Sequence, residues 1–176
     1  MSVISIVCVD SNNGISKNGN IPWTNNTDRT LYKSIINMYD NAVLIMGVNT
    51  WNTSPVYKGD KFKYVVITSG KTEMKQKRLT PETFTNIEDA LNAHKGEYVF
   101  LIGGKSIYEK GAKYSDFFFI SRLEQNYDCD ISLDLDFIYD KSVFSKHYYK
   151  NYNGLVFNLY SNHEYKFNSL TEVVNQ

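Results

Sequence analysis

Residues 21–33 (Ile-Pro-Trp-Thr-Asn-Asn-Thr-Asp-Arg-Thr-Leu-Tyr-Lys) contain the side chain that is best placed to do chemistry. Asp28 is the one carboxylate between positions 11 and 39. On a helix it would share the face of Leu31 and Tyr32, which follow it by three and four positions. Burying a carboxylate there is costly without a partner, so Asp28 is a candidate for the floor of a polar pocket. The alternative is a half-exposed first-turn acid that only complements the helix dipole.

The elements around Asp28 must hold it in place. Asn26 or Thr27 can act as the helix N-cap, because either side chain can accept a free N–H of the first turn. Apolar residues then recur at helical spacing as far as Tyr39. Just before the helix, Pro22 and Trp23 predict a rigid turn and a large aromatic wall beside the acid.

Composition limits the possible functions. The chain has 176 residues with 19 basic and 19 acidic side chains, so its zero net charge gives no field that would attract nucleic acid. No apolar run approaches the length of a membrane span, and no signal peptide is visible. The two cysteines and three histidines show no metal-ligand spacing. We expect a cytoplasmic protein without a metal, a membrane segment or a nucleic-acid partner.

Buried strands alternate with helices, which predicts an α/β fold with a mainly parallel sheet. The expected strands are residues 3–9, 42–46, 63–68, 98–102 and 117–123, with a short one near 84–85. Helices are expected from residue 26, from 48, over 87–93 with Asn86 as N-cap, and over 105–114. Asn153-Gly154 predicts an antiparallel hairpin of residues 144–152 and 155–161. A single domain is expected over residues 1–167, followed by a frayed tail over 168–176.

Glycines follow two of these strands. Gly47 ends one strand and opens a helix, and Gly103-Gly104 do the same after the most hydrophobic strand. Missing β-carbons let a ligand approach the backbone, and helix N-termini favour phosphate. This is not the dinucleotide fingerprint G-x-G-x-x-G, so a standard Rossmann fold is not indicated.

Three loops allow more than one interpretation. Residues 10–20 form either a surface loop or a lid over the site. The locally basic residues 71–82 form a solvated linker, or else one of their cations reaches a phosphate. The acidic residues 127–140 lack the glycine and closing glutamate of an EF-hand, so calcium binding is not expected.

Taken together, these motifs resemble the dihydrofolate reductase family over essentially the whole chain. The most specific is Pro22-Trp23 with an acid five residues after the tryptophan. The others, in chain order, are strand 4–9, Gly14-Ile15, Met46-Gly47 with Thr50-Trp51, segment 65–69, Ile102-Gly103-Gly104 with Tyr108, Asp116, Ser121-Arg122 and Cys129-Asp130. The resemblance implies a three-layer α/β fold with a mainly parallel eight-stranded sheet and a C-terminal antiparallel hairpin.

The resemblance also implies a reaction: NADPH reduces 7,8-dihydrofolate to tetrahydrofolate, which serves one-carbon metabolism and thymidylate synthesis. It assigns catalysis to Asp28, which orients the pterin, to Ser121, which backs the acid, and to Trp23, which holds a proton-relay water. Substrate contacts are expected from Ile6, Cys8, Ile21, Tyr32, Lys61 and Lys63. Cofactor contacts are expected from Cys8, Ile15, Gly47, Asn49, Thr50, Thr68, Ser69, Ile102, Gly103, Gly104, Lys105, Ser106, Ile107 and Tyr108.

The sequence departs from the family pattern at several positions. Val48 replaces a basic residue near the 2′-phosphate of the cofactor, so Ser69 and Lys71 would have to compensate. Segment 59–63 lacks the arginine that clamps the glutamate tail of the substrate, and only Lys61 or Lys63 could supply a charge there. Ser16 stands at a loop glycine and Arg29 at an apolar position, which predicts altered loop closure.

Two other readings stay open. The pyrimidine reductase of riboflavin synthesis shares the fold but lacks the Pro-Trp and acid signature. A non-catalytic descendant that binds a nucleotide or a partner protein is favoured only by Val48 and the missing arginine. We expect a monomer that binds dihydrofolate and antifolate inhibitors.

Overall fold

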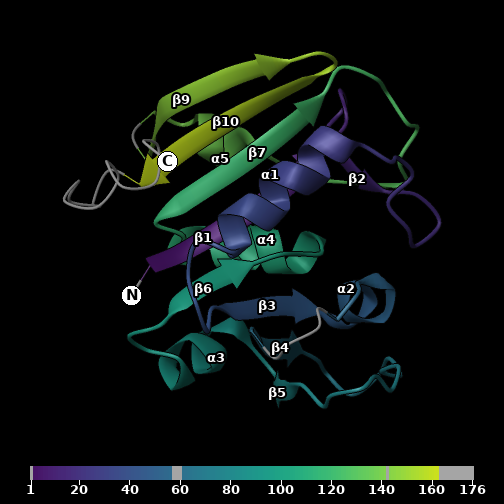
Figure 1. Ribbon diagram of the computed structural model, residues 1–176, viewed down its shortest axis with the longest axis vertical. Helices are drawn as coiled ribbons and strands as arrows, with labels where there is room; N and C mark the ends of the chain where they lie inside the picture. Colours follow the sequence, from purple (N-terminus) through teal and green to yellow (C-terminus); the bar gives the residue numbers. More distant parts are fainter. Residues whose placement is uncertain (1, 57–60, 142, 163–176) are drawn as a thin grey trace.

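The computed structural model describes residues 2–56, 61–141 and 143–162. Its main sheet has eight strands in the order β5-β4-β3-β6-β1-β7-β10-β9 (Figure 1). The strands are β1 (Ser2–Val9), β3 (Val43–Gly47), β4 (Lys63–Ile67), β5 (Glu82–Phe84), β6 (Tyr98–Leu101), β7 (Phe117–Leu123), β9 (Phe144–Tyr152) and β10 (Leu155–Asn162). The first six strands in this order, from β5 to β7, are parallel to one another. Strand β10 is antiparallel to β7 and β9 is antiparallel to β10, so the sheet ends in the predicted antiparallel hairpin. The expected tail over 168–176 lies outside the described residues.

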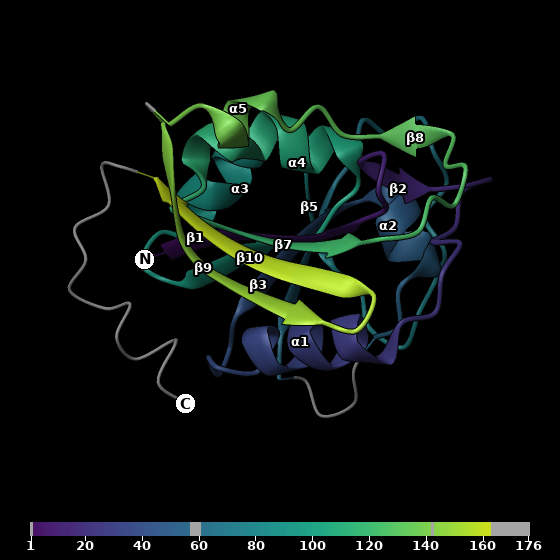
Figure 2. The same cartoon turned by 90° about the horizontal axis from the view of Figure 1, so that it is seen from above.

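Helices cover both faces of this sheet, which makes three layers (Figure 2). Helix α1 (Asn26–Ile36) lies on one face, and α3 (Ile87–Ala93), α4 (Lys105–Gly111) and α5 (Asp136–Tyr139) lie on the other. The short helix α2 (Val48–Thr53) follows β3, and a 3-10 turn η1 (Ala112–Tyr114) extends α4. This confirms the predicted fold class. None of the described helices is long and apolar enough to cross a membrane.

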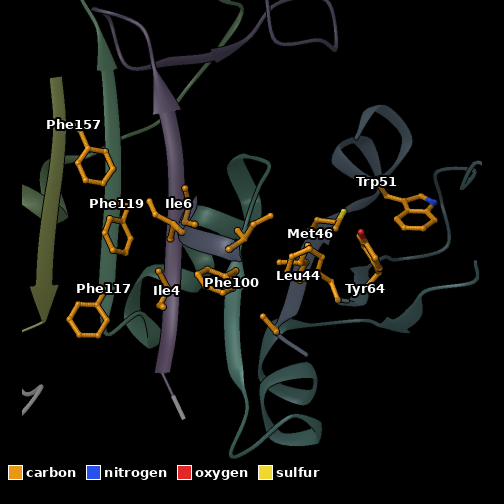
Figure 3. Close-up of a cluster of buried hydrophobic side chains, with 14 of the residues drawn as sticks. Ile4, Ile6, Leu44, Met46, Trp51, Tyr64, Phe100, Phe117, Phe119 and Phe157 are labelled. Atoms are coloured by element: carbon orange, nitrogen blue, oxygen red, sulfur yellow. The ribbon is translucent and has the colours of Figure 1, made fainter. Parts of the chain in front are cut away.

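The two faces follow from the alternation of side chains along each strand. Along β1, Ile4 and Ile6 join the cluster that includes Ile36 of α1, whereas Val7 and Val9 join a cluster on the opposite face. Figure 3 shows the first cluster as one layer from Phe157 on β10, through β7, β1, β6 and β3, to Trp51 on α2. Even-numbered residues of β1 therefore point toward α1, which decides where Cys8 lies.

The N-cap of helix α1 lies earlier in the chain than the sequence indicated. The N-cap is Asn25, not Asn26 or Thr27, and its side-chain oxygen accepts the backbone N–H of Asp28 at 2.9 Å. Asn25 has the extended backbone of an N-cap, so Asn26 and Thr27 become the first two helical residues. Asp28 is consequently the third residue of the helix, held by its own backbone N–H.

Three elements lie in segments that the sequence predicts to be loops. Strand β2 (Gly14–Ser16) pairs with β8 (Ile131–Ser132) in a separate two-stranded sheet, and α5 forms inside the acidic segment 127–140. Strands of two or three residues are too short to show an alternating pattern. The small sheet joins the loop before α1 to the loop after β7.

Candidate active site

Strand register brings three predicted residues together at Asp28. Cys8 on β1 and Ser121 on β7 are register partners. Both lie on the α1 face, because Ile6 and Phe119, two residues earlier on their strands, belong to the cluster there. Hydrogen bonding from the side chains of Ser121 and Cys8 lowers the pKa of Asp28 on α1, so both side chains lie beside this carboxyl. The carboxylate therefore has the partners that its partial burial requires.

The electrostatics of Asp28 are a balance of opposing effects. Burial raises the pKa of the Asp28 carboxyl above its usual value, while the hydrogen bonds from Ser121 and Cys8 and the charge of Arg29 oppose that rise. The net shift is upward. Burial, followed by the nearby charge of Asp28, raises the pKa of the Cys8 thiol far above its usual value, so this thiol stays protonated and acts as a donor.

Trp23 forms one wall of the same site. Its ring is buried, its side chain lowers the pKa of the Cys8 thiol, and its ring centroid lies 5.3 Å from that of Tyr127 in a tilted contact. Tyr127 was counted only as the start of an acidic loop, and the sequence gives no signal that it reaches Trp23. The loop after β7 thus packs against the aromatic wall.

Tyr108, predicted to contact the cofactor, has an additional structural bond. Its hydroxyl donates to the backbone carbonyl of Ile6 at 2.8 Å, from α4 to the neighbouring β1. Burial is the main cause that raises the pKa of this phenol, and the charges of Asp28 and Cys8 act in the same direction. The side chain fixes the central strand two residues before Cys8.

Backbone atoms converge where β3 and β6 end. The N–H of Gly47 donates to the carbonyl of Gly103 at 2.8 Å, and the Gly103-Gly104 peptide bond is cis. A β-carbon on Gly103 would lie 3.0 Å from the Tyr108 hydroxyl, whereas one on Gly104 would meet only Thr50, at 3.7 Å. Gly104 therefore faces open space at the carboxyl edge of the sheet, where ligands of open α/β sheets bind.

The remaining predicted cofactor residues lie along the same edge. Ile102 follows β6, Thr68 and Ser69 follow β4, and the Thr68 hydroxyl accepts the N–H of Gly70 at 3.0 Å. Lys105 forms an ion pair with Glu109 at 3.7 Å. The others are Asn49, which is exposed on α2, and Ser106 and Ile107, which lie on α4.

A cavity of about 850 Å³ borders this edge on the α3 and α4 side. Two of the predicted cofactor residues, Ser106 and Ile107, line it, together with Ile67 of β4. Asp28 is not among its lining residues, because the cavity lies on the face of the sheet opposite α1 (Figure 2).

Asp10 is a buried carboxylate that the sequence analysis missed. It accepts backbone N–H groups of Asn12 at 2.9 Å, Gly14 at 2.7 Å and Tyr127 at 3.0 Å. Burial tends to raise the pKa of its carboxyl, but these N–H groups and the thiol of Cys129 outweigh it, so the pKa is lowered. In the sequence, an acid at the end of an apolar strand looks like an ordinary loop residue. Nothing there indicates that Asp10 binds three backbone N–H groups of two loops.

The loop containing Ile15 is fixed at a second point. The backbone N–H of Asn18 donates to the Asp130 carboxylate at 2.8 Å, and the N–H of Asp130 donates to the carbonyl of Ser16 at 3.1 Å. Ile15, expected near the cofactor, is half-buried in β2. The loop over residues 10–20 is therefore bonded to the loop after β7.

The predicted substrate residues differ in their surroundings. Ile6 is buried, Tyr32 is half-buried against the same cluster, and Ile21 is 65% exposed beside the turn. Lys61 pairs with Asp40 at 3.3 Å, and Lys63 is bonded to Glu97. Both pairs reach solvent, and the pair with Asp40 is the longer and therefore the weaker one, which makes Lys61 the better candidate for a substrate carboxylate.

Comparisons with known proteins agree with this geometry. The sequence model of the family described as dihydrofolate reductase matches residues 2–162. The chain is 28% identical to the dihydrofolate reductase of Ureaplasma parvum serovar 3, over 92% of this chain and 97% of that protein. It is 33% identical to dihydrofolate reductase type 9 of Escherichia coli, over 76% of this chain and 77% of that protein.

Another relative is much longer. Segregation and condensation protein A of Mycoplasmoides gallisepticum is 31% identical over 75% of this chain, but the match spans only 22% of that protein. Among solved structures, dihydrofolate reductase from Enterococcus faecalis, complexed with NADP(H) and RAB-propyl, has a TM-score of 0.72. The two chains are 16% identical, and the superposition covers 92% of this chain and 96% of the Enterococcus faecalis chain. The likeness supports the assignment of the fold. Because the family match extends over nearly the whole chain, the protein belongs to the dihydrofolate reductase family.

Proposed function

We propose that this protein catalyses the NADPH-dependent reduction of 7,8-dihydrofolate to 5,6,7,8-tetrahydrofolate. The observation that carries the proposal is the half-buried carboxylate of Asp28, which two strand residues hold and an aromatic wall adjoins. A carboxylate in a partly dry pocket forms strong charge-assisted hydrogen bonds with a ligand that offers paired N–H donors. The amidine edge of the pterin is such a ligand.

Each residue then has a role that fits its place. Asp28 orients the pterin, and Ser121 backs the acid through its hydroxyl. Ile6, Cys8 and Tyr32 line the pocket, with Ile21 at its exposed rim. Trp23 closes the pocket and would hold the water that delivers the proton. Because Trp23 also acts on the Cys8 thiol, the water and the thiol would share the indole N–H.

The edge formed by β3, β4 and β6 fits an NADPH molecule. The N-caps of α2 and α4 are Gly47 and Gly104. Because glycine has no side chain, no cap occupies the first-turn N–H groups, and these can donate to the cofactor. Thr50 lies between them and supplies a hydroxyl. When bound, NADPH supplies the hydride that adds to C6 of the pteridine, while a proton is added at N5. Val48 leaves Ser69 and Lys71 to recognise the 2′-phosphate.

The same proposal covers the setting of the protein. We propose a monomeric, cytoplasmic enzyme with one catalytic domain over residues 1–167. Its ligands are dihydrofolate, NADPH and antifolate inhibitors that mimic the pterin. Neither nucleic acid nor membrane is part of this function.

Oxidation of NADPH by the purified protein, followed with and without dihydrofolate, tests the proposal. We expect oxidation that depends on dihydrofolate and yields tetrahydrofolate. If the protein instead reduces only a ribosylated pyrimidine, the riboflavin-type activity replaces this proposal. NADPH binding without turnover of either substrate would support a binding protein.

A further inference from the structure

Segment 73–77 of the basic loop is bonded along helix α2. The side chain of Asn52 donates to the backbone carbonyl of Glu73 at 3.0 Å and accepts the backbone N–H of Lys75 at 2.8 Å. The indole N–H of Trp51 donates to the carbonyl of Lys75 at 2.9 Å. Two consecutive side chains of α2 therefore hold this segment, so the helix and the segment form one unit.

The side chain of Lys77 completes this unit at the carboxyl end of α2. Its ammonium donates to the backbone carbonyls of Trp51 and Ser54, and it lies 4.5 Å from the centroid of the Trp51 ring. Carbonyls at the end of a helix lack partners within the helix and form the negative end of its dipole. The Lys77 cation supplies those partners, and the aromatic face adds a cation–π attraction. This cation of the basic segment is thus bound to the helix and not to a phosphate.

We propose that Lys77 is a positioning residue that fixes helix α2, and with it Thr50, at the edge of the sheet where the cofactor binds. The proposal rests on the proposed function, which places NADPH against Gly47, Thr50 and Gly104. Lys77 itself makes no contact with the cofactor in this proposal and acts through the helix.

Helix α2 depends on such support because it has only 6 residues. Helices this short are not stable alone in water, so contacts with the rest of the protein decide where they lie. On the core side, the ring of Trp51 packs edge-on against Tyr64 of β4, with centroids 6.0 Å apart (Figure 3). The Thr50 hydroxyl lies 3.7 Å from the place of a β-carbon on Gly104. A helix that lost its hold at the carboxyl end would move Thr50 relative to Gly104.

A direct effect of the Lys77 charge on the anionic cofactor is the competing explanation. A helix of 6 residues is about 9 Å long, so a charge at its end is about one Debye length from its start and is largely screened. Burial, and then the charge of Lys75, lowers the pKa of the Lys77 ammonium, so the two cations are close together. Lys75 is exposed and is bonded to α2 through its backbone N–H and carbonyl. Lys75→Met therefore removes an equal charge and keeps the bonds to the helix.

The test is a fluorescence titration with NADPH of Lys77→Met, Lys77→Arg and Lys75→Met, at a temperature where thermal melting shows each protein to be folded. For Lys77→Met we expect about tenfold weaker binding, since a small misplacement of a binding group has effects of this order or larger. The affinity for dihydrofolate, measured in the same way, should not change. Lys77→Arg keeps a cation with several donors and should restore binding to within about threefold of the wild type. Lys75→Met should also stay within about threefold, because an exposed charge contributes little.

Three results would overturn the proposal. One is an unchanged NADPH affinity in Lys77→Met, and another is an equal loss in Lys75→Met, which would show that charge alone matters. The third is an equal loss of NADPH and dihydrofolate affinity in Lys77→Met, which would show a general structural role.

Nitrogen-15 NMR of the lysine ammonium groups gives a readout that does not depend on cofactor binding. In the wild-type protein, the Lys77 protons are bonded to two carbonyls and should exchange with water more slowly than those of Lys75. Lys77→Arg and Lys75→Met assign the two signals. Equally fast exchange of both groups would contradict the bonds to α2. A wild-type protein that shows the slow Lys77 signal but binds no NADPH would overturn the proposed function instead, so the two failures can be told apart.

Discussion

The carboxylate of Asp10 accepts the backbone N–H of Tyr127 at 3.0 Å, across 117 positions of the chain. The same side chain accepts the N–H groups of Asn12 and Gly14 at the start of the loop over residues 10–20. The ring of Tyr127 packs against Trp23. A single buried carboxylate thus joins the loop over residues 10–20 to the loop after β7, whose Tyr127 packs against Trp23.

Replacing Asp10 with asparagine should weaken this junction. The amide presents a donor to at least one backbone N–H, which is left unsatisfied at a cost of about 1–3 kcal/mol in the free energy of unfolding. Urea denaturation measures this loss. Asp128→Asn makes the same chemical change at an exposed residue of the neighbouring loop and should change stability little. Equal effects of the two substitutions would contradict the role of Asp10.

The stabilisation by Asp10 should depend on pH. Because its pKa is lowered in the folded protein, the stabilisation is present above the unfolded value, about 3.9, and is lost as pH falls through the folded pKa. The difference in unfolding free energy between wild type and Asp10→Asn should therefore be constant near neutral pH and shrink in acid. A difference that grew in acid would have the wrong sign.

Gly47→Ala tests the backbone edge without disturbing the core. The added β-carbon would lie 3.7 Å from Ile107, an ordinary contact, so the fold should keep its stability. If the cofactor approaches this backbone, we expect NADPH to bind about 5- to 100-fold more weakly, which corresponds to roughly 1–3 kcal/mol of steric cost. Fluorescence titration with NADPH measures the change.

A contrasting substitution separates binding from folding. Gly111→Ala would place a β-carbon 2.3 Å from Leu101 in the core, so it should lower stability. Unchanged NADPH affinity in Gly47→Ala would place the cofactor elsewhere.

Lys61 is expected to supply the charge that grips the glutamate tail of dihydrofolate. Lys61→Ala should raise KM for dihydrofolate about 5- to 30-fold, the equivalent of roughly 1–2 kcal/mol for one charge-assisted bond. Lys61→Arg offers a planar fork and should lower KM below the wild-type value. Steady-state kinetics at saturating NADPH measures both.

Lys63→Ala is the matched control. Lys63 is already bonded to Glu97, so its loss should change stability more than KM. A KM that rose only in Lys63→Ala would reverse the assignment.

Much of the site could be predicted from the sequence because its residues lie in local patterns. Asp28 shares a helical face with Leu31, and Gly47 and Gly104 each stand between a strand and a helix. Their placement at one pocket or one edge then follows from the topology of a parallel sheet.

What could not be predicted depends on contacts between distant segments. The bond between Asp10 and Tyr127 and the ring contact between Tyr127 and Trp23 both require the loops to be placed first. Three consecutive residues before Asp28 can each cap a helix, so the choice of Asn25 rested on backbone geometry.

The most direct test of the account compares Asp28→Asn with the wild-type protein in dihydrofolate-dependent oxidation of NADPH. Removing the charge should lower kcat by about 10²-fold or more, the cost of losing the group that orients the substrate. NADPH affinity should stay near that of the wild type. Stability should not fall, because burial raises the pKa of the Asp28 carboxyl and its charged form therefore costs stability at neutral pH. Two results would contradict a catalytic Asp28. One is that Asp28→Asn keeps the turnover of the wild-type protein, and the other is that it loses turnover only together with folding and NADPH binding.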